Sequence, residues 1–246
     1  MISAFAGALA LASTVSATTD TTPDTVQIRL VANMGVMVSQ GENKVLFDAL
    51  FTDVYEGRFH VPTSDDREAM ITASGEFDGV DALLFTHEHG DHFNAGEAGL
   101  ALAANDALVL MAPDQVSSQL SASATELPDG LSVRAVPMFH MEGMDNHAFI
   151  IELGGTSVLH LGDTNPDEAD FTVLDDEDID VVLYPIWFVQ SETGQAELSG
   201  RFAGARHVAV HVPAHISGEK MAEYLGKGNS LVDPGDRIVI NPGDHD

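Results

Sequence analysis

A dense group of metal-binding side chains lies in one short segment, THEHGDH, which contains His87, His89, Asp91 and His92. Neutral imidazoles and carboxylates are the donors that zinc, manganese and iron(II) accept. The alternate spacing lets His87 and His89 face one ion while Asp91 and His92 face another. Clustering so many imidazoles away from water without a metal would be costly. The segment therefore predicts a centre for two divalent cations.

The elements on either side of this segment can position it. Residues 80–85 read VDALLF, a continuous apolar run typical of a strand covered on both faces, and residues 95–105 have helix-forming composition. Loops at the ends of such strands are where α/β proteins place their ligands. Glu88 points away from the other ligands by alternation, so we expect it to have a structural role.

The rest of the chain predicts one α/β domain over residues 26–246. Alternating apolar and polar residues up to residue 50 predict a β-meander, and strands then alternate with helices, one of them at residues 114–124. This order indicates mixed sheets with helices outside them. Residues 52–64 and 186–200 are expected to shape a pocket, and Tyr55 and His60 could reach a substrate.

Composition excludes several functions. The 246 residues include 39 acidic and 10 basic side chains, giving a formal charge of −29. Nucleic-acid binding is therefore not expected, because phosphate contacts need clustered Lys and Arg, and a cationic or neutral small molecule suits the overall field better. The chain has no cysteine, so any metal must be held by His, Asp or Glu.

The N-terminus is predicted to direct export. Residues 1–17 form an apolar run ending in small residues, and residues 18–25 form a polar linker. No Lys or Arg precedes the apolar run, so a cytoplasmic location stays open as the alternative. No segment approaches about 18 uninterrupted apolar residues, so stable membrane insertion is not expected.

The ligand pattern resembles that of the metallo-β-lactamase superfamily, whose signature is HxHxDH after a buried strand. Its remaining elements occur here in order, as His140, Asp163, and His211 or His215. The resemblance is greatest to the simple metal-dependent hydrolases that include ascorbate-phosphate lactonases. It implies a four-layered αββα sandwich of two mixed sheets. Asp163 follows a glycine at a strand end, where a carboxylate can bridge two metals; its alternative role is to cap a helix at residues 166–174.

Two of the outlying ligands have rivals. We favour His140, which emerges from the end of a strand, over His147, which opens the next one. We favour His211 over His215, because Pro213 ends the strand and leaves His215 on the following loop. His211 and His215 could exchange by a small loop movement. The predicted metal ligands are thus His87, His89, Asp91, His92, His140, Asp163 and His211.

This centre predicts a hydrolase that cleaves an ester, lactone, amide or phosphodiester bond of a small molecule with metal-bound hydroxide. Asp91 is the predicted catalytic residue, which holds a metal and orients the nucleophile. Zinc is the expected cofactor, with Mn²⁺ and Fe²⁺ as alternatives. The competing functions are an iron-containing oxygen or sulfur oxidoreductase of the same fold, and a non-catalytic metal-dependent binding protein. The oligomeric state cannot be predicted.

Overall fold

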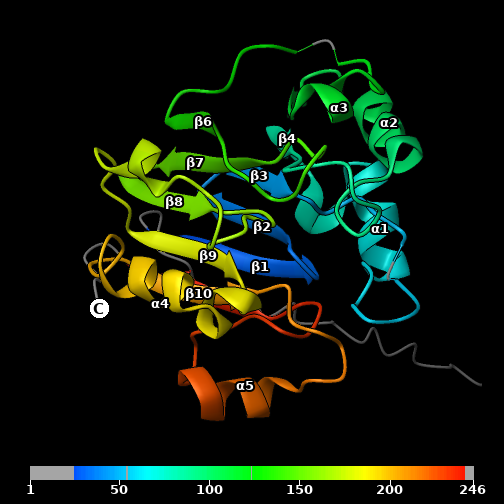
Figure 1. Ribbon diagram of the computed structural model, residues 1–246. Coiled ribbons are helices and arrows are strands. Elements are labelled where there is room, and N and C mark those ends of the chain that lie inside the picture. Colours follow the sequence, from blue (N-terminus) through cyan, green and yellow to red (C-terminus); the bar gives the residue numbers. More distant parts are fainter. Residues whose placement is uncertain (1–24, 54, 123, 242–246) are drawn as a thin grey trace, which may run out of the picture.

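Two mixed β-sheets form the centre of the protein, with helices on their outer faces (Figure 1). The computed structural model describes residues 25–53, 55–122 and 124–241. The predicted export signal, residues 1–17, lies outside the described residues. Within the described part of the chain, no helix has the length and apolar composition needed to cross a membrane.

Each sheet combines an antiparallel and a parallel part. The strands are β1 (Val26–Ala32), β2 (Gly35–Gln40), β3 (Asn43–Phe47), β4 (Ala82–Leu84), β5 (Val109–Met111), β6 (Leu131–Pro137), β7 (His147–Leu153), β8 (Thr156–His160), β9 (Val181–Pro185), β10 (Arg206–Val210) and β11 (Arg237–Ile240). The first sheet has the order β11-β1-β2-β3-β4-β5 and the second β10-β9-β8-β7-β6. Pairing is antiparallel from β11 to β3 and from β6 to β8, and parallel elsewhere.

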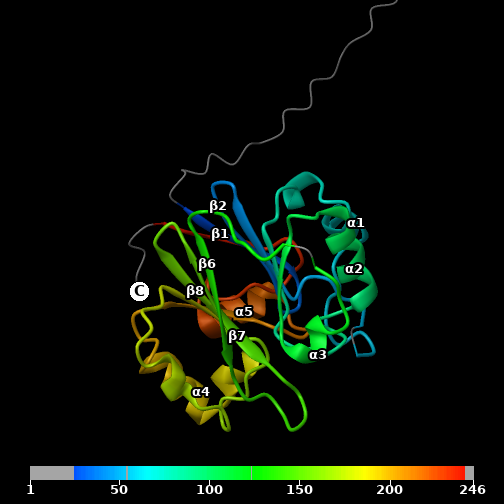
Figure 2. The same ribbon diagram turned by 90° about the horizontal axis from the view of Figure 1, so that it is seen from above.

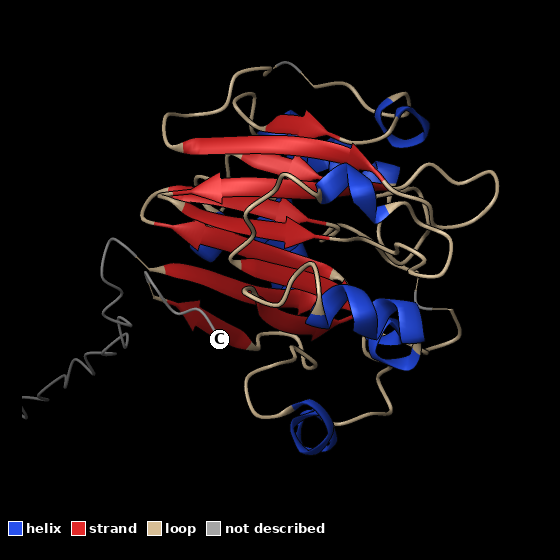
Figure 3. Cartoon of the chain, turned by 60° about the vertical axis from the view of Figure 1, so that its left-hand side comes forward, coloured by secondary structure: helices blue, strands red, loops and turns tan. Residues whose placement is uncertain are grey.

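Helices cover both outer faces, as Figures 2 and 3 show. They are α1 (Ser64–Ile71), α2 (Ala95–Ala104), α3 (Asp114–Ser117), α4 (Glu192–Ser199) and α5 (Gly218–Leu225), with 3-10 turns at Gly75–Phe77, Phe171–Leu174 and Ile186–Gln190. Met70 of α1 and Leu102 of α2 pack on the first sheet. Leu198 of α4 and Met221 of α5 pack on the second. The predicted αββα sandwich is confirmed.

Strand periodicity explains how one sequence serves two cores. Val26, Ile28 and Leu30 of β1 point into the core between the sheets, while Val31 packs under the helices of the first sheet. Arg29 shares that outer face and is buried, and it donates to Asp66 of α1 at 2.8 Å. The ion pair satisfies a cation that would otherwise be costly to bury.

Two helix predictions were wrong. The expected helix at residues 114–124 ends at Ser117, and Ala124 instead forms a parallel bridge with Val109. The serines of this segment compete for backbone hydrogen bonds and weaken a helix. The expected helix at residues 166–174 is a series of turns followed by a 3-10 turn. There is accordingly no α-helix at residues 166–174 for Asp163 to cap.

Candidate metal centre

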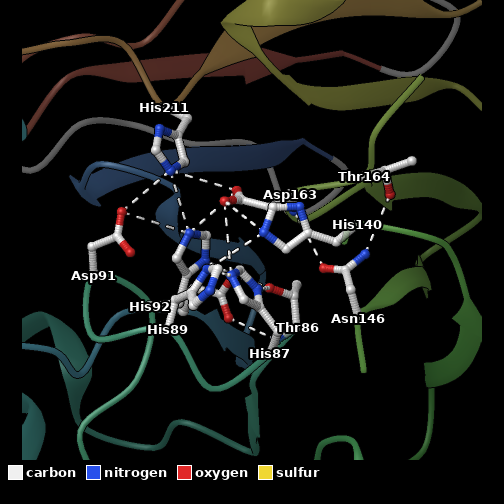
Figure 4. Close-up of polar contacts among 12 residues, drawn as sticks. Thr86, His87, His89, Asp91, His92, His140, Asn146, Asp163, Thr164 and His211 are labelled. Carbon is white, nitrogen blue, oxygen red and sulfur yellow. Dashed lines mark hydrogen bonds and ion pairs between the residues drawn. The ribbon is translucent and has the colours of Figure 1, made fainter. Parts of the chain in front are cut away.

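Four loops converge at one place, and each follows the carboxyl end of a strand (Figure 4). The loop after β4 supplies the residues of THEHGDH. The loops after β6, β8 and β10 supply His140, Asp163 and His211. The structure thus brings together all seven predicted metal ligands, although they are spread over more than half of the sequence.

The ligand atoms form two groups, each with its members within 4.8 Å of one another. The first group is His87, His89, His140 and Asp163, and the second is Asp91, His92 and His211. In the first, Nδ1 of His89 lies 2.9 Å from Nε2 of His87 and 3.4 Å from Nε2 of His140. In the second, Nε2 of His211 lies 3.3 Å from Nε2 of His92 and 3.4 Å from Oδ2 of Asp91.

Asp163 lies between the two groups and presents one oxygen to each. Its Oδ2 is 3.7 Å from Nε2 of His87 and 3.9 Å from Nε2 of His140. Its Oδ1 is 3.2 Å from Nε2 of His92 and 3.5 Å from Nε2 of His211. This is the placement that a carboxylate bridging two cations requires.

The turn that carries Asp163 depends on a glycine. Gly162 has φ +55°, and an added Cβ would lie 2.7 Å from Oδ1 of Asn146 and 2.7 Å from Cβ of Thr86. The same Asn146 oxygen accepts a hydrogen bond from the Asp163 backbone N–H at 3.3 Å. Only a residue without a side chain lets the turn approach the ligand loop this closely.

Asp48 orients two of the histidines, and the sequence analysis missed it. This fully buried carboxylate accepts from the N–H of Thr86 at 2.7 Å and from its hydroxyl at 2.6 Å. It also accepts from Nδ1 of His92 at 2.8 Å, while the Thr86 hydroxyl contacts Nδ1 of His87 at 2.9 Å. With both Nδ1 atoms engaged, the two Nε2 atoms are left to face the centre. The only sequence signal was a lone acidic residue within the apolar segment VLFDALF.

Asn33 joins the β1–β2 turn to the second group and was also missed. The side-chain NH₂ group of Asn33 donates to Oδ2 of Asp91 at 3.1 Å, and the Asn33 backbone carbonyl accepts from the His211 backbone N–H at 3.1 Å. Both Asn33 (φ 53°) and His211 (φ 57°) adopt left-handed backbone conformations. The hydrogen bond from the His211 N–H to Asn33 and the left-handed backbone of His211 together hold this histidine at the end of β10.

The buried groups of the site have pKa values shifted in different directions. Burial alone would lower the pKa of His92, but Asp163 and Asp48 raise it well above its usual value. Burial alone would raise the pKa of Asp163, but His92 and His211 hold it well below its usual range. Burial, assisted by His92, lowers the pKa of His87. Without metal, the site thus favours a proton on His92 and a neutral His87, the form of imidazole that binds a metal.

The residues fit two cations. Ligands about 2.1 Å from a tetrahedral zinc lie about 3.4 Å apart, close to several of the nitrogen and oxygen separations here. Oδ1 of Asp163 and Nδ1 of His211 are buried without a hydrogen bond of good geometry to any described residue. A cation near Oδ1 would satisfy a carboxylate oxygen that is otherwise costly to bury.

The rival histidines lie elsewhere. His147 belongs to β7 and lines a separate small cavity, while His215 is exposed, and neither is in the two ligand groups. His60 lies 3.8 Å from Asp233 and does not line the cavity at the centre. Glu88 accepts from Gln119 at 3.2 Å, away from the ligand groups.

A cavity of about 510 Å³ opens onto the centre. Its lining includes the ligand residues Asp91, Asp163 and His211 and the aromatic residues Tyr55 and Trp187. Residues 52–64 and 186–200 therefore shape the pocket, as predicted. The volume lies within the range of small-molecule sites, about 300–1,000 Å³.

The chain belongs to the β-lactamase superfamily, because the family model of the β-lactamase superfamily domain matches residues 43–227. This confirms the resemblance seen in the ligand motif. A curated relative from Natranaerobius thermophilus, a "UPF0173 metal-dependent hydrolase", is 24% identical over 173 residues, covering 65% of this chain and 71% of its own.

Solved structures share the fold. A possible metal-dependent hydrolase from Veillonella parvula has a TM-score of 0.60 at 16% identity, covering 87% of this chain and 98% of its own. A diiron β-hydroxylase from Streptomyces venezuelae has a TM-score of 0.55 at 14% identity, covering 90% of this chain and 55% of its own. At these identities the likeness establishes the metallo-β-lactamase fold alone.

Proposed function

We propose that the protein is a metal-dependent hydrolase that uses two divalent cations, zinc by preference, to cleave an ester, lactone, amide or phosphodiester bond of a small molecule. The observation that carries this proposal is the position of Asp163, with one carboxylate oxygen toward each ligand group. Membership of the superfamily and the relatives named as metal-dependent hydrolases support it.

Each residue of the centre has a defined task. One cation would be held by His87, His89 and His140, and the other by Asp91, His92 and His211. Asp163 would help to hold both cations. When bound, the two cations would lower the pKa of an attacking water and polarise the bond under attack.

Asp91 is the residue we assign to the nucleophile. It lines the cavity, and Asn33 fixes its Oδ2. Burial alone would raise the pKa of Asp91, but the hydrogen bond from His211 and the nearby His92 lower it. An ionised carboxylate at this place can hold a metal and orient a water.

The cavity size and overall charge support a small-molecule substrate. A space of about 510 Å³ accommodates a metabolite-sized molecule. The formal charge of −29 disfavours nucleic acid.

Replacing His87 and His89 together with alanine tests the proposal. We expect loss of bound metal and of turnover on a panel of esters, lactones, amides and phosphodiesters. His215→Ala is the matched control, because His215 lies outside both ligand groups. Unchanged turnover in the double variant would overturn the hydrolase centre.

An iron oxidoreductase is the second candidate. All the predicted ligands are nitrogen or oxygen donors, which iron also accepts, and the fold is shared with a diiron β-hydroxylase. Metal analysis of protein made in zinc-rich and iron-rich media, with oxygen-consumption assays, separates the two. Activity restricted to the iron form would replace the hydrolase proposal, whereas tight small-molecule binding without turnover would indicate a binding protein.

We also propose that the protein is exported. The support is the apolar run of residues 1–17, which ends in small residues. Mass spectrometry of protein from its own cells should show a chain that lacks this segment. A full-length chain in the cytoplasm would contradict export.

A further inference from the structure

Arg58 is the one arginine whose guanidinium has no hydrogen bond or ion pair with any described residue. The other arginines all have acceptors: Arg29 has Asp66, Arg67 has Glu97, Arg134 has Glu177, Arg201 has Glu197, Arg206 has the Gly228 carbonyl and Arg237 has Glu76. In a chain with 39 acidic and 10 basic residues, an arginine whose guanidinium has no acceptor is unexpected. Its charge is available to a ligand.

This arginine lines the cavity of the metal centre. The loop that carries it is held on both sides, because Asp53 N–H donates to the Gly90 carbonyl at 3.1 Å and Ala214 N–H donates to the Arg58 carbonyl at 2.9 Å. The neighbouring ring of Phe59 packs edge-on against His211, with centroids 4.4 Å apart. The backbone of Arg58 is therefore held beside the centre, while its side chain is exposed to solvent.

The remaining charges of the cavity favour an anion. Its acidic lining residues, Asp91 and Asp163, are both predicted metal ligands, so two bound dications would more than neutralise them. With both cations bound, the residues that line the cavity would carry a net positive charge, opposite in sign to that of the whole chain.

We infer that Arg58 binds an anionic group of the substrate, so that the hydrolase acts on small molecules that carry a carboxylate or phosphate group in addition to the bond it cleaves. This inference rests on the proposed function. The planar guanidinium can form two parallel hydrogen bonds to either group. Phe59 and Trp187 supply aromatic surface for the body of the molecule. The overall charge alone suggested a cationic or neutral substrate, because it does not show where the few cations lie.

A binding experiment tests the inference without turnover. Trp187 is the single tryptophan of the chain and lines the cavity, so its fluorescence reports ligand binding. We would titrate zinc-loaded protein with phenylacetate, phenyl phosphate and the neutral phenylacetamide. The variants are Arg58→Gln and, as a matched control, Lys227→Gln, which removes one exposed cation outside the cavity.

The expected result is a preference for at least one anion over the amide, which falls about tenfold in Arg58→Gln, the change typical of one lost charge-assisted hydrogen bond. Lys227→Gln should keep the wild-type preference. The anion with the larger loss identifies carboxylate or phosphate as the recognised group. A wild-type protein that does not prefer either anion, or an Arg58→Gln variant that keeps the full preference, overturns the inference.

A kinetic comparison separates this inference from the proposed function. For 4-nitrophenyl hydrogen glutarate and the neutral 4-nitrophenyl valerate, we expect the ratio of the two kcat/KM values to fall about tenfold in Arg58→Gln. If the wild type hydrolyses neither ester nor any other hydrolase substrate, while anion binding still depends on Arg58, the hydrolase proposal fails and the anion site stands. If the wild type hydrolyses the esters and Arg58→Gln leaves the ratio of kcat/KM values unchanged, the hydrolase proposal stands and the anion site fails.

Discussion

Asp48→Asn changes one buried atom and should weaken metal binding through residues that it positions. The carboxylate is fully buried and accepts from the Thr86 N–H, the Thr86 hydroxyl and Nδ1 of His92. An asparagine has one acceptor oxygen, so its NH₂ group must face one of these donors. In either orientation of the amide His92 loses a nearby negative charge, and where the NH₂ group takes the place of Oδ2 it also loses its hydrogen bond.

The magnitude follows from that lost contact. A hydrogen bond to a charged group contributes about 1.5–3 kcal/mol, and removing a carboxylate behind a metal-binding histidine lowers metal affinity about 10–100-fold. Such a loss equals about 1.4–2.8 kcal/mol. Solvent screens the interaction between Asp48 and His92 little, because both side chains are fully buried.

The assay is competition for zinc against a chelator of known affinity, with metal counted by mass spectrometry. Asp81→Asn is the matched control, since Asp81 also accepts from a backbone N–H, that of Lys44 at 2.8 Å, but it precedes β4 instead of following β3. We expect wild-type zinc affinity in the control. An Asp48→Asn affinity within twofold of the wild type would refute the positioning role.

Three further predictions concern the same network. Gly162→Ala should lower the free energy of unfolding, measured by urea denaturation, by about 2–4 kcal/mol, because its Cβ would clash with neighbouring atoms at a residue with left-handed backbone. Gly155 is also left-handed, but an added Cβ there would have no atom within 4 Å, so Gly155→Ala should lower this free energy less. Asn33→Gly keeps the left-handed backbone but removes the donor to Asp91, so turnover should fall about five- to tenfold. In Asn33→Asp turnover should fall further, because the new carboxylate repels that of Asp91. Equal turnover in Asn33→Gly and the wild type would contradict this prediction. Zinc binding at neutral pH should release the extra proton of His92, seen by calorimetry in buffers of different ionisation enthalpy, and affinity should rise with pH up to the raised pKa of His92. The stability of the metal-free fold changes with pH in the opposite direction to zinc affinity. Protonated His92 stabilises this fold below about pH 6.5, and the stabilisation is lost as pH rises through the raised pKa of His92.

Local patterns predicted most of the centre. Four ligands lie within six residues after a buried strand, and their order with His140, Asp163 and His211 matches the family pattern. That these strand ends meet depends on the order of strands in two sheets, which the family resemblance implied and local patterns did not. The alternation of β1 predicts which residues enter the core.

Contacts between distant segments could not be predicted in this way. The Asp48–Thr86 hydrogen bond spans 38 residues and the Asn33–Asp91 hydrogen bond spans 58, so neither has a spacing signature. The choice of His211 over His215, by contrast, was predicted from Pro213, and the structure places His211 in the centre with a left-handed φ of 57°. Arg58 is recognisable only after every other arginine has been assigned an acceptor.

The most direct test of the two-metal centre is a crystal structure of the zinc-loaded protein with anomalous scattering at the zinc edge. Two peaks should appear, one among His87, His89 and His140 and the other among Asp91, His92 and His211, with Asp163 contacting both. A single peak, or a peak at His147 or His215 in place of either, would contradict the account.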